Sequence, residues 1–315
     1  MDVPADSQLL TTSAAAGLLD VHPSTVKRWC DEPALPSRKT VGGHRRIHLK
    51  DLLAFAEDRG IETMLDVFDP WQGNVWSALS AARGPQGFHR LIGLGLAWLA
   101  RGETDLLGRL ILEAGRDEDI PFSRFLDECI REFMREVGEE WRKGRLQVGE
   151  EHLATQVMEE VLVRLRIESR GDRTVLRTVP GAQPVALVGC VEGDQHELGA
   201  QAVRAVLERA GWRVYYLGPN VPLEDFAAIQ RAQGASLVCI SFSPHSGFPD
   251  LQRALTVLGE FYRPMKPYAL ALGGDSSDIY DADLPQAPFE ALSFFRSAGE
   301  FQDWLEASAE SPDSG

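Results

Sequence analysis

The sequence predicts a multidomain protein of the α plus α/β class, in which two helical parts precede a doubly wound parallel sheet. Residues 7–60 contain short helical segments separated by turns, and residues 71–168 repeat apolar positions at three- and four-residue spacing. Residues 183–308 alternate short apolar runs with amphipathic helices, the pattern of a Rossmann-like sheet. A length of 315 residues, with 44% hydrophobic and 25% charged residues, fits two or three globular domains.

The first part predicts two helices and a tight turn. Residues 11–19 suggest a short capped helix, residues 21–24 a turn, and residues 24–30 a second helix. The pair Gly42-Gly43 permits a tight β-turn, after which residues 49–56 return to helical spacing. This arrangement is a helix-turn-helix followed by a hairpin.

Charge is distributed unevenly along the chain. The formal net charge is −15, but residues 22–50 hold seven basic and two acidic residues, a net charge of +5, so the other residues sum to −20. A basic segment on an acidic body can contact a phosphate backbone through that segment alone. The residues expected to contact DNA lie on the second helix and in the hairpin: Ser24, Thr25, Lys27, Arg28, Gly43, His44, Arg45 and Arg46.

The run Gly42-Gly43-His44-Arg45-Arg46 resembles the wing of MerR-type winged helix-turn-helix proteins. The wing of that family usually begins with proline, and Val41 stands in its place here. The resemblance implies that operator DNA is a partner. The alternative is a small helical domain with a solvated basic loop.

The second part is predicted to be a bundle of four helices. Its apolar residues recur at the spacing of one helix face, as in Ile130, Phe133 and Met134, and again in Leu153, Val157, Val161 and Leu165. Residues 169–184 read as a linker. Beyond them, strands are expected at residues 185–190, 214–217, 236–241, 268–272 and 291–295, with a helix over residues 196–210.

Asp194, His196 and Gly199 form an Asp-x-His-x-x-Gly motif directly after the first expected strand. A neutral imidazole is a good metal ligand, and a carboxylate two residues away can hold the proton of its other ring nitrogen. The motif resembles the cobalamin-binding domains of corrinoid proteins and mutases. The resemblance implies that His196 is the lower axial ligand of cobalt, that Asp194 orients it, and that Gly199 allows close approach of the nucleotide tail or tight helix packing.

Later residues extend this resemblance. That family also has a serine-containing strand end about forty residues further on, and then a pair of glycines; Ser241, Ser243, Gly273 and Gly274 stand at those places. The resemblance implies that they line the groove for the dimethylbenzimidazole tail. Leucine is usual where Ser243 stands. The alternative is a response-regulator-like or other Rossmann domain that carries a histidine by chance.

Trp141 is followed ten residues later by Glu151 and His152. This spacing resembles the helical caps of light-responsive, cobalamin-dependent MerR-type repressors, and it implies that the three side chains lie over the upper face of the corrinoid. Light-responsive members carry a histidine directly after this tryptophan, whereas Arg142 follows it here. A stable product with two histidine ligands is therefore in doubt. The alternative for Trp141 is plain bundle core.

The resemblance covers the whole chain and implies a transcriptional regulator, a repressor rather than an enzyme. The expected cofactor is cobalamin, as adenosylcobalamin or else methylcobalamin, and the expected assembly is a homo-oligomer, a dimer or a tetramer. Two alternatives stay open: a corrinoid methyl carrier of a methyltransferase system, which does not need the basic segment at residues 22–50, and a regulator of this architecture that senses another ligand.

Four widely spaced cysteines without a Cys-x-x-Cys pair fit reduced thiols in a cytoplasm. The longest apolar run near the middle, residues 91–100, is too short to span a bilayer, and no export signal is visible. We therefore expect a cytoplasmic protein without a membrane partner.

Overall fold

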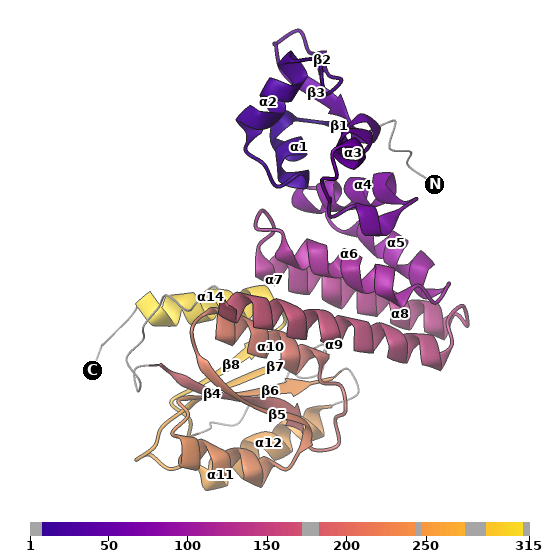
Figure 1. The fold of residues 1–315 in the computed structure, drawn as a ribbon. Helices are drawn as coiled ribbons and strands as arrows, with labels where there is room; N and C mark the ends of the chain where they lie inside the picture. Colours follow the sequence, from indigo (N-terminus) through magenta and orange to yellow (C-terminus); the bar gives the residue numbers. More distant parts are fainter. Residues whose placement is uncertain (1–7, 172–182, 244–246, 275–287, 311–315) are drawn as a thin grey trace. The chain divides into compact units, whose positions relative to one another are not determined.

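The computed structural model describes residues 8–171, 183–243, 247–274 and 288–310 (Figure 1). The chain divides into two units, Met1–Asp119 and Ile120–Gly315. The boundary falls inside the segment predicted as one helical bundle. Most of the predicted linker, residues 172–182, lies outside the described residues.

The first unit begins with the predicted helix-turn-helix and its hairpin. The elements follow in the order β1 (Leu9–Leu10), α1 (Thr12–Leu18), α2 (Pro23–Asp31), β2 (Arg38–Lys39), β3 (Arg45–His48) and α3 (Leu49–Asp58). The three short strands form an antiparallel sheet in the order β1-β3-β2. The hairpin between β2 and β3 is the predicted wing.

Side-chain caps explain where the two helices begin. The hydroxyl of Thr11 accepts a hydrogen bond from the backbone N–H of Ala14 at 3.0 Å, as expected for a capped α1. Before α2, the ring nitrogen Nδ1 of His22 accepts from the N–H of Ser24 at 3.2 Å, and Pro23 occupies the first turn, where its missing N–H costs nothing.

Three longer helices complete the first unit, after a short 3-10 helix at Asp66–Phe68: α4 (Gln72–Arg83), α5 (His89–Leu99) and α6 (Thr104–Arg116). Trp98 is 1% exposed at their centre. Its ring stacks on Phe68, with the ring centroids 6.0 Å apart, and meets the edge of Trp71 at 5.9 Å. Helical spacing predicted these segments correctly.

The second unit opens with helices that are tied to its sheet domain. α7 (Phe122–Arg124), a π-helical segment (Phe125–Arg131) and α8 (Glu132–Arg142) follow one another without a break, and α9 (Val148–Gly171) comes next. The carboxylate of Asp127 accepts from the N–H groups of Ala298 and Gly299, both at 2.9 Å, at the start of α14 (Ala298–Glu310). α9 extends three residues into the predicted linker.

A five-stranded parallel sheet forms the rest of the second unit, with the order β5-β4-β6-β7-β8. The strands are β4 (Val185–Val191), β5 (Arg213–Val221), β6 (Leu237–Phe242), β7 (Ala269–Gly274) and β8 (Ala291–Phe295). All neighbouring strands are parallel. The predicted doubly wound sheet is therefore confirmed.

Helices cover both faces of this sheet (Figure 1). α10 (Leu198–Arg209) packs on one face together with α14, and α9 packs against α10. α10 begins two residues later than predicted, which leaves His196 in the preceding loop. α11 (Leu223–Gln233) and α12 (Phe248–Phe261) cover the other face, where Leu187, Phe226 and Leu270 are among the buried residues of the main core.

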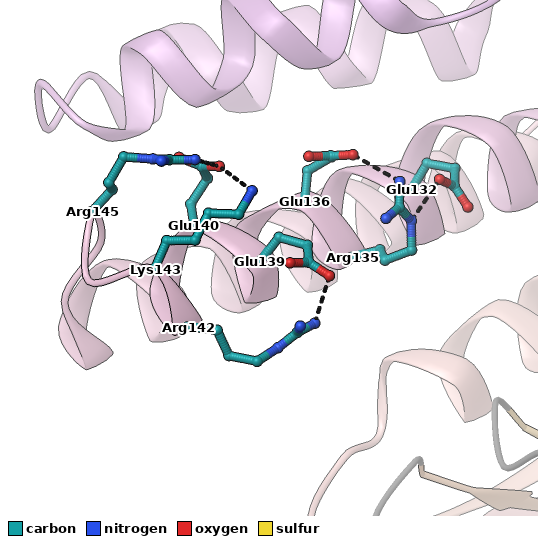
Figure 2. Close-up of polar contacts among 8 residues, drawn as sticks. All are labelled: Glu132, Arg135, Glu136, Glu139, Glu140, Arg142, Lys143 and Arg145. Carbon is teal, nitrogen blue, oxygen red and sulfur yellow. Dashed lines mark hydrogen bonds and ion pairs between the residues drawn. The ribbon is translucent and has the colours of Figure 1, made fainter.

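The exposed face of α8 carries a series of ion pairs (Figure 2). Arg135 pairs with Glu132 at 2.8 Å and with Glu136 at 2.7 Å, and Arg142 pairs with Glu139 at 2.9 Å. At the end of the helix, Glu140 accepts from Arg145 and from Lys143. No helix among the described residues, α8 included, is long and apolar enough to cross a membrane.

Replacing Gly274 by alanine should destabilise the second unit. A Cβ atom at this position would lie 1.9 Å from the carbonyl oxygen of Phe242 on the neighbouring strand. We expect Gly274→Ala to lower the free energy of unfolding by more than ~1 kcal/mol, measured by urea denaturation. Gly138→Ala on α8, where no atom lies within 4 Å of the new Cβ, is the matched control and should be neutral or stabilising. Equal effects of the two substitutions would contradict this packing.

The ion pair at the end of α8 predicts a pH dependence. Hydrogen bonds from Arg145 and then Lys143, working against partial burial, lower the pKa of Glu140 from 4.5 to about 2. A depressed pKa stabilises the fold above the ordinary pKa of the carboxyl, and that stabilisation is lost as the pH falls through the folded value. Glu140→Gln should therefore lower the urea midpoint at neutral pH, and the difference from wild type should vanish between pH 4.5 and about 2. A constant difference over that range would exclude this pair as its source.

Candidate functional site

The loop of residues 192–197 joins β4 to α10 at the carboxyl edge of the sheet. In a doubly wound sheet, ligands bind outside the carboxyl ends of the strands, where the chain connections diverge. In this strand order that point lies between β4 and β6. The loop with Asp194 and His196 follows β4, and Ser243 follows β6, so both lie where the fold predicts a ligand.

Asp194 connects the two strand ends. Asp194 is only 5% exposed. Its Oδ1 accepts from the N–H of His196 at 2.9 Å, and its Oδ2 accepts from the N–H of Ser243 at 2.7 Å. Burial acts to raise the pKa of Asp194, but the hydrogen bonds from His196 and Ser243 outweigh it, and the net pKa is lowered. Asp194 is therefore a buried carboxylate that stays ionised.

His196 is oriented by that carboxylate. Its ring nitrogen Nδ1 lies 3.1 Å from Oδ1 of Asp194, while 60% of its side chain is exposed. A proton on Nδ1 satisfies the carboxylate, and this tautomer presents the lone pair of Nε2. The structure thus brings together the two residues that the motif predicts, in an arrangement suited to a metal ligand.

The glycines and serines of the extended motif lie at the same edge of the sheet. A Cβ at Gly199 would lie 2.9 Å from the hydroxyl of Ser241, so this glycine allows α10 to approach β6 closely. Ser241 is paired in register with Gly273 on β7. A Cβ on Gly273 would lie 3.1 Å from the carbonyl oxygen of Phe295. Small residues at these positions therefore allow close packing at this edge of the sheet.

The predicted cap residues lie at the corner between α8 and α9. Trp141 is in the last turn of α8 and is 47% exposed, which does not fit the alternative that it is bundle core. Gly144, with φ of 70°, donates its N–H to the carbonyl of Trp141 at 2.9 Å and ends the helix. Glu151 and His152 follow near the start of α9, and Nε2 of His152 lies 3.7 Å from Oε2 of Glu151.

α9 relates this corner to the His196 loop. Glu159 on α9 has a raised pKa, first because it is partly buried and second because of the negative charge of Glu197. Glu197 directly follows His196 and directly precedes α10. Glu151 precedes Glu159 by eight residues, about 12 Å along the helix. The cap residues and the His196 loop thus belong to one unit and are connected by one helix.

The donor set fits a metal that brings most of its own ligands. Among the residues that the structure describes, no group of three or more His, Cys, Asp and Glu side chains could hold a metal ion. A single exposed imidazole with a buried carboxylate behind it can supply one axial ligand to a cobalt that a corrin ring already holds. The site therefore fits cobalamin better than a free metal ion.

A separate hollow lies in the first unit. It has a volume of about 520 Å³ and is lined by the start of α1, by α2 and by the wing: Thr11, Thr12, Ser13, Lys27, Gly43, His44, Arg45 and Arg46. Five of these eight residues are expected DNA contacts. The three hydroxyl residues at the start of α1 were not among the predicted DNA contacts. Their run of hydroxyls before an apolar helix is the only sequence signal, and it is shared by any N-cap.

The predicted DNA contacts on α2, and Arg45 of the wing, are placed as follows. Lys27 and Arg28 are exposed on α2, whereas Val26 between them and the turn is buried. Ser24 is exposed and its hydroxyl lies 2.7 Å from Nδ1 of His22, and Thr25 is half-buried. Arg45 forms an ion pair with Asp31 of α2, so its guanidinium holds the wing against that helix.

The wing itself is a tight hairpin. The N–H of Thr40 donates to the carbonyl of His44 at 2.8 Å, and Gly43 adopts φ of 78° in the turn. Val41 at its tip is fully exposed, and Arg46 donates to the carbonyl of Arg45 at 3.2 Å. The predicted glycine turn is therefore present without the proline usual at this position.

Comparison with protein families agrees with both sites. Residues 184–290 match the B12 binding domain family, and residues 96–166 match a second family that is also described as a B12 binding domain. Residues 9–60 match a helix-turn-helix domain family.

Relatives include repressors and corrinoid proteins. The HTH-type transcriptional repressor CarH of Myxococcus xanthus is 30% identical over 140 residues, 44% of each chain. The HTH-type transcriptional repressor CarA of the same organism is 31% identical over 178 residues, 55% of this chain and 54% of that protein. The chain thus spans about half the length of these two relatives. Dimethylamine corrinoid protein 1 of Methanosarcina acetivorans is 24% identical over 138 residues, 44% of this chain and 62% of that protein.

Among solved structures, the monomethylamine corrinoid protein of Methanosarcina barkeri aligns with a TM-score of 0.51 at 15% identity, covering 67% of this chain and 95% of that one. This likeness shows the fold. The resemblance predicted from the sequence is confirmed: the chain combines a helix-turn-helix domain with B12 binding domains, and two repressors of the helix-turn-helix type are among its relatives.

Proposed function

We propose that this protein is a transcriptional repressor whose binding to operator DNA is controlled by bound cobalamin. The observation that carries the proposal is the exposed imidazole of His196 held by the buried, ionised carboxylate of Asp194, in a chain that also has a helix-turn-helix. The two related repressors of Myxococcus xanthus support the regulatory part. The protein would act in the cytoplasm and not as an enzyme.

We assign DNA binding, the cap and cobalamin binding to three segments of the chain. Residues 7–60 bind DNA, residues 71–168 form the cap and residues 183–308 hold cobalamin. His196 is the lower ligand of cobalt through Nε2, and Asp194 holds the proton on Nδ1. The edge formed by Gly199, Ser241, Ser243, Gly273 and Gly274 accommodates the nucleotide tail.

Trp141, Glu151 and His152 cover the upper ligand. Cobalamin in its adenosyl form supplies a cobalt–carbon bond that light can break, and we favour this form over methylcobalamin. Arg142 occupies the position after Trp141 and is paired with Glu139 at 2.9 Å, so this position offers an always-charged guanidinium instead of an imidazole. A product with a second histidine would have to use His152 or another residue.

Control of DNA binding follows from assembly. The upper ligand favours one arrangement of the cap, and that arrangement forms a homo-oligomer, a dimer or a tetramer. Linked DNA-binding domains bind a repeated operator far more tightly than single ones. Loss of the upper ligand in light shifts the equilibrium towards the state that releases DNA.

A corrinoid methyl carrier is the second candidate, because a dimethylamine corrinoid protein is also among the relatives. The basic segment at residues 22–50, with its net charge of +5, favours the regulator, since a methyl carrier does not need it. A regulator of this architecture that senses another ligand is the third candidate. Unlike the other two, it would not take up cobalamin.

Loading the full chain with adenosylcobalamin in the dark tests the proposed function. We expect a red protein with a corrinoid spectrum and a mass, measured by light scattering, that is a multiple of the monomer and falls on illumination together with retention of duplex DNA. His196→Ala should lose the cofactor or change its spectrum, whereas His89→Ala, a histidine that is not among the predicted site residues, should keep the wild-type spectrum. A colourless wild-type protein would reject cobalamin binding. A spectrum that changes in light without a change in mass or DNA retention would reject the switch alone.

Replacing Arg46 by alanine tests the wing. A wing residue that contacts phosphate contributes equally to all sequences, so the affinity for a random duplex should fall. The slope of log K against log salt concentration should become shallower by about 1. Arg101→Ala, an exposed arginine of the same unit outside the hollow, is the matched control. An unchanged slope in Arg46→Ala would show that the wing is assigned wrongly.

A further inference from the structure

The edge strand β5 holds the His196 loop at two points that the motif does not include. Asp194 contacts His196 within the loop, and a contact between residues two apart cannot by itself fix the loop to the sheet. Anchors to the sheet must come from other strands, and Ser243 after β6 is one of them. Cys190 of β4 also contacts the carbonyl of His196, and Arg253 of α12 pairs with Glu192. Two residues of β5, Tyr216 and Asn220, hold the loop at further points.

Tyr216 holds the end of the loop that joins α10. Its hydroxyl donates to Oε2 of Glu197 at 2.5 Å, and the guanidinium of Arg204 lies 4.9 Å from the centre of its ring. Burial, and then the neighbouring carboxylate of Glu197, raise the pKa of Tyr216 well above its ordinary value. The hydroxyl therefore remains a donor, and this charge-assisted bond is of the stronger kind.

Asn220 holds the other end of the loop. Its Oδ1 accepts from the N–H of Gly193 at 2.7 Å, and its own N–H donates to the carbonyl of Asp194 at 2.9 Å. Asn220 has φ of 54°, a left-handed conformation that asparagine tolerates better than most residues.

Irregular pairing brings Asn220 to this place. The register between β4 and β5 shifts twice, between Val188 and Gly189 and again between Gly189 and Val191. Such bulges bend a strand and redirect its side chains. The end of β5 reaches the turn at Gly193 at the place of these shifts.

We propose that Tyr216 and Asn220 are positioning residues for the lower cobalt ligand: by fixing the His196 loop at both ends they set the strength of the bond between the imidazole and cobalt. The inference rests on the proposed cobalamin function and deepens it. A loop that is already ordered loses less freedom when its histidine binds the metal. Partners of this kind, one contact removed from the metal, typically change metal affinity by ~10–100-fold.

Tyr216→Phe is the decisive variant, with Tyr215→Phe as its matched control. Neighbouring residues of a strand point to opposite faces, and Tyr215 packs against the main core on the side of α11 and α12. The full chain is loaded with aquocobalamin, reduced to the paramagnetic cobalt(II) form, and examined by electron paramagnetic resonance. Labelling histidine with the spin-half isotope of nitrogen turns the axial splitting from a triplet into a doublet, which separates His196 from the cofactor's own base.

We expect the ratio of histidine-bound to histidine-free cobalt to fall roughly tenfold in Tyr216→Phe and to stay unchanged in Tyr215→Phe. Glu197→Gln keeps an oxygen that accepts from Tyr216 but loses the charge, so its ratio should lie between those of wild type and Glu197→Ala, and Glu197→Ala should resemble Tyr216→Phe. Asn220→Gly keeps the backbone conformation, removes the acceptor for Gly193, and should also lower the ratio. Such a pattern separates positioning from a general loss of stability.

Hydrogen exchange of residues 192–199 in the cofactor-free chain gives a second readout. Tyr216→Phe should exchange faster in this loop than wild type and Tyr215→Phe, because one anchor of the loop is lost. A wild-type ratio together with wild-type exchange in Tyr216→Phe would overturn the inference and leave the proposed function standing. A wild-type chain that takes up no cobalamin would overturn the proposed function and the cobalt part of the inference with it.

Discussion

The carboxylate of Asp194 is the constraint on which the C-terminal site depends. Burying a charge is costly unless hydrogen bonds replace the lost water, and here Asp194 receives the backbone N–H groups of His196 and Ser243 as well as the ring of His196. Because those donors come from the ends of β4 and β6, satisfying one charge joins two strand ends. The same bonds fix the tautomer of the histidine. The hydrogen bonds that join this edge of the sheet are therefore also the ones that orient the histidine.

Charge also separates the two tasks of the chain. A protein with a net charge of −15 is a poor DNA binder as a whole, yet residues 22–50 carry +5, and three of their basic residues, Lys27, Arg45 and Arg46, line one hollow. Repulsion between DNA and the acidic remainder leaves the basic segment as the preferred point of contact. In the second unit, acidic residues have other roles: Asp194 orients His196, Asp127 caps α14 and Glu197 anchors a loop.

Features that depend on local spacing could be predicted from the sequence. Asp194 and His196 are two residues apart, so their contact needs only a loop, and the alternation of strands and helices predicted the parallel sheet. Features that depend on pairing between strands could not: Tyr216 reaches the loop from the register in which it pairs with Val188, and Asn220 lies where the pairing of β4 and β5 shifts. The π-helical segment and the unit boundary at Asp119 were missed for a similar reason, since tertiary packing decides them. Ser243 shows why a departure from a family pattern can be harmless, because its backbone N–H reaches Asp194 at 2.7 Å and leucine has the same N–H.

Diffraction at the cobalt absorption edge, from crystals of the chain grown in the dark with adenosylcobalamin, tests the central claim most directly. The account predicts an anomalous peak within bonding distance of Nε2 of His196, with Nδ1 still in contact with Asp194 and the cofactor's own base displaced into the edge of the sheet. A peak bonded to that base instead, with the imidazole turned away, would contradict it.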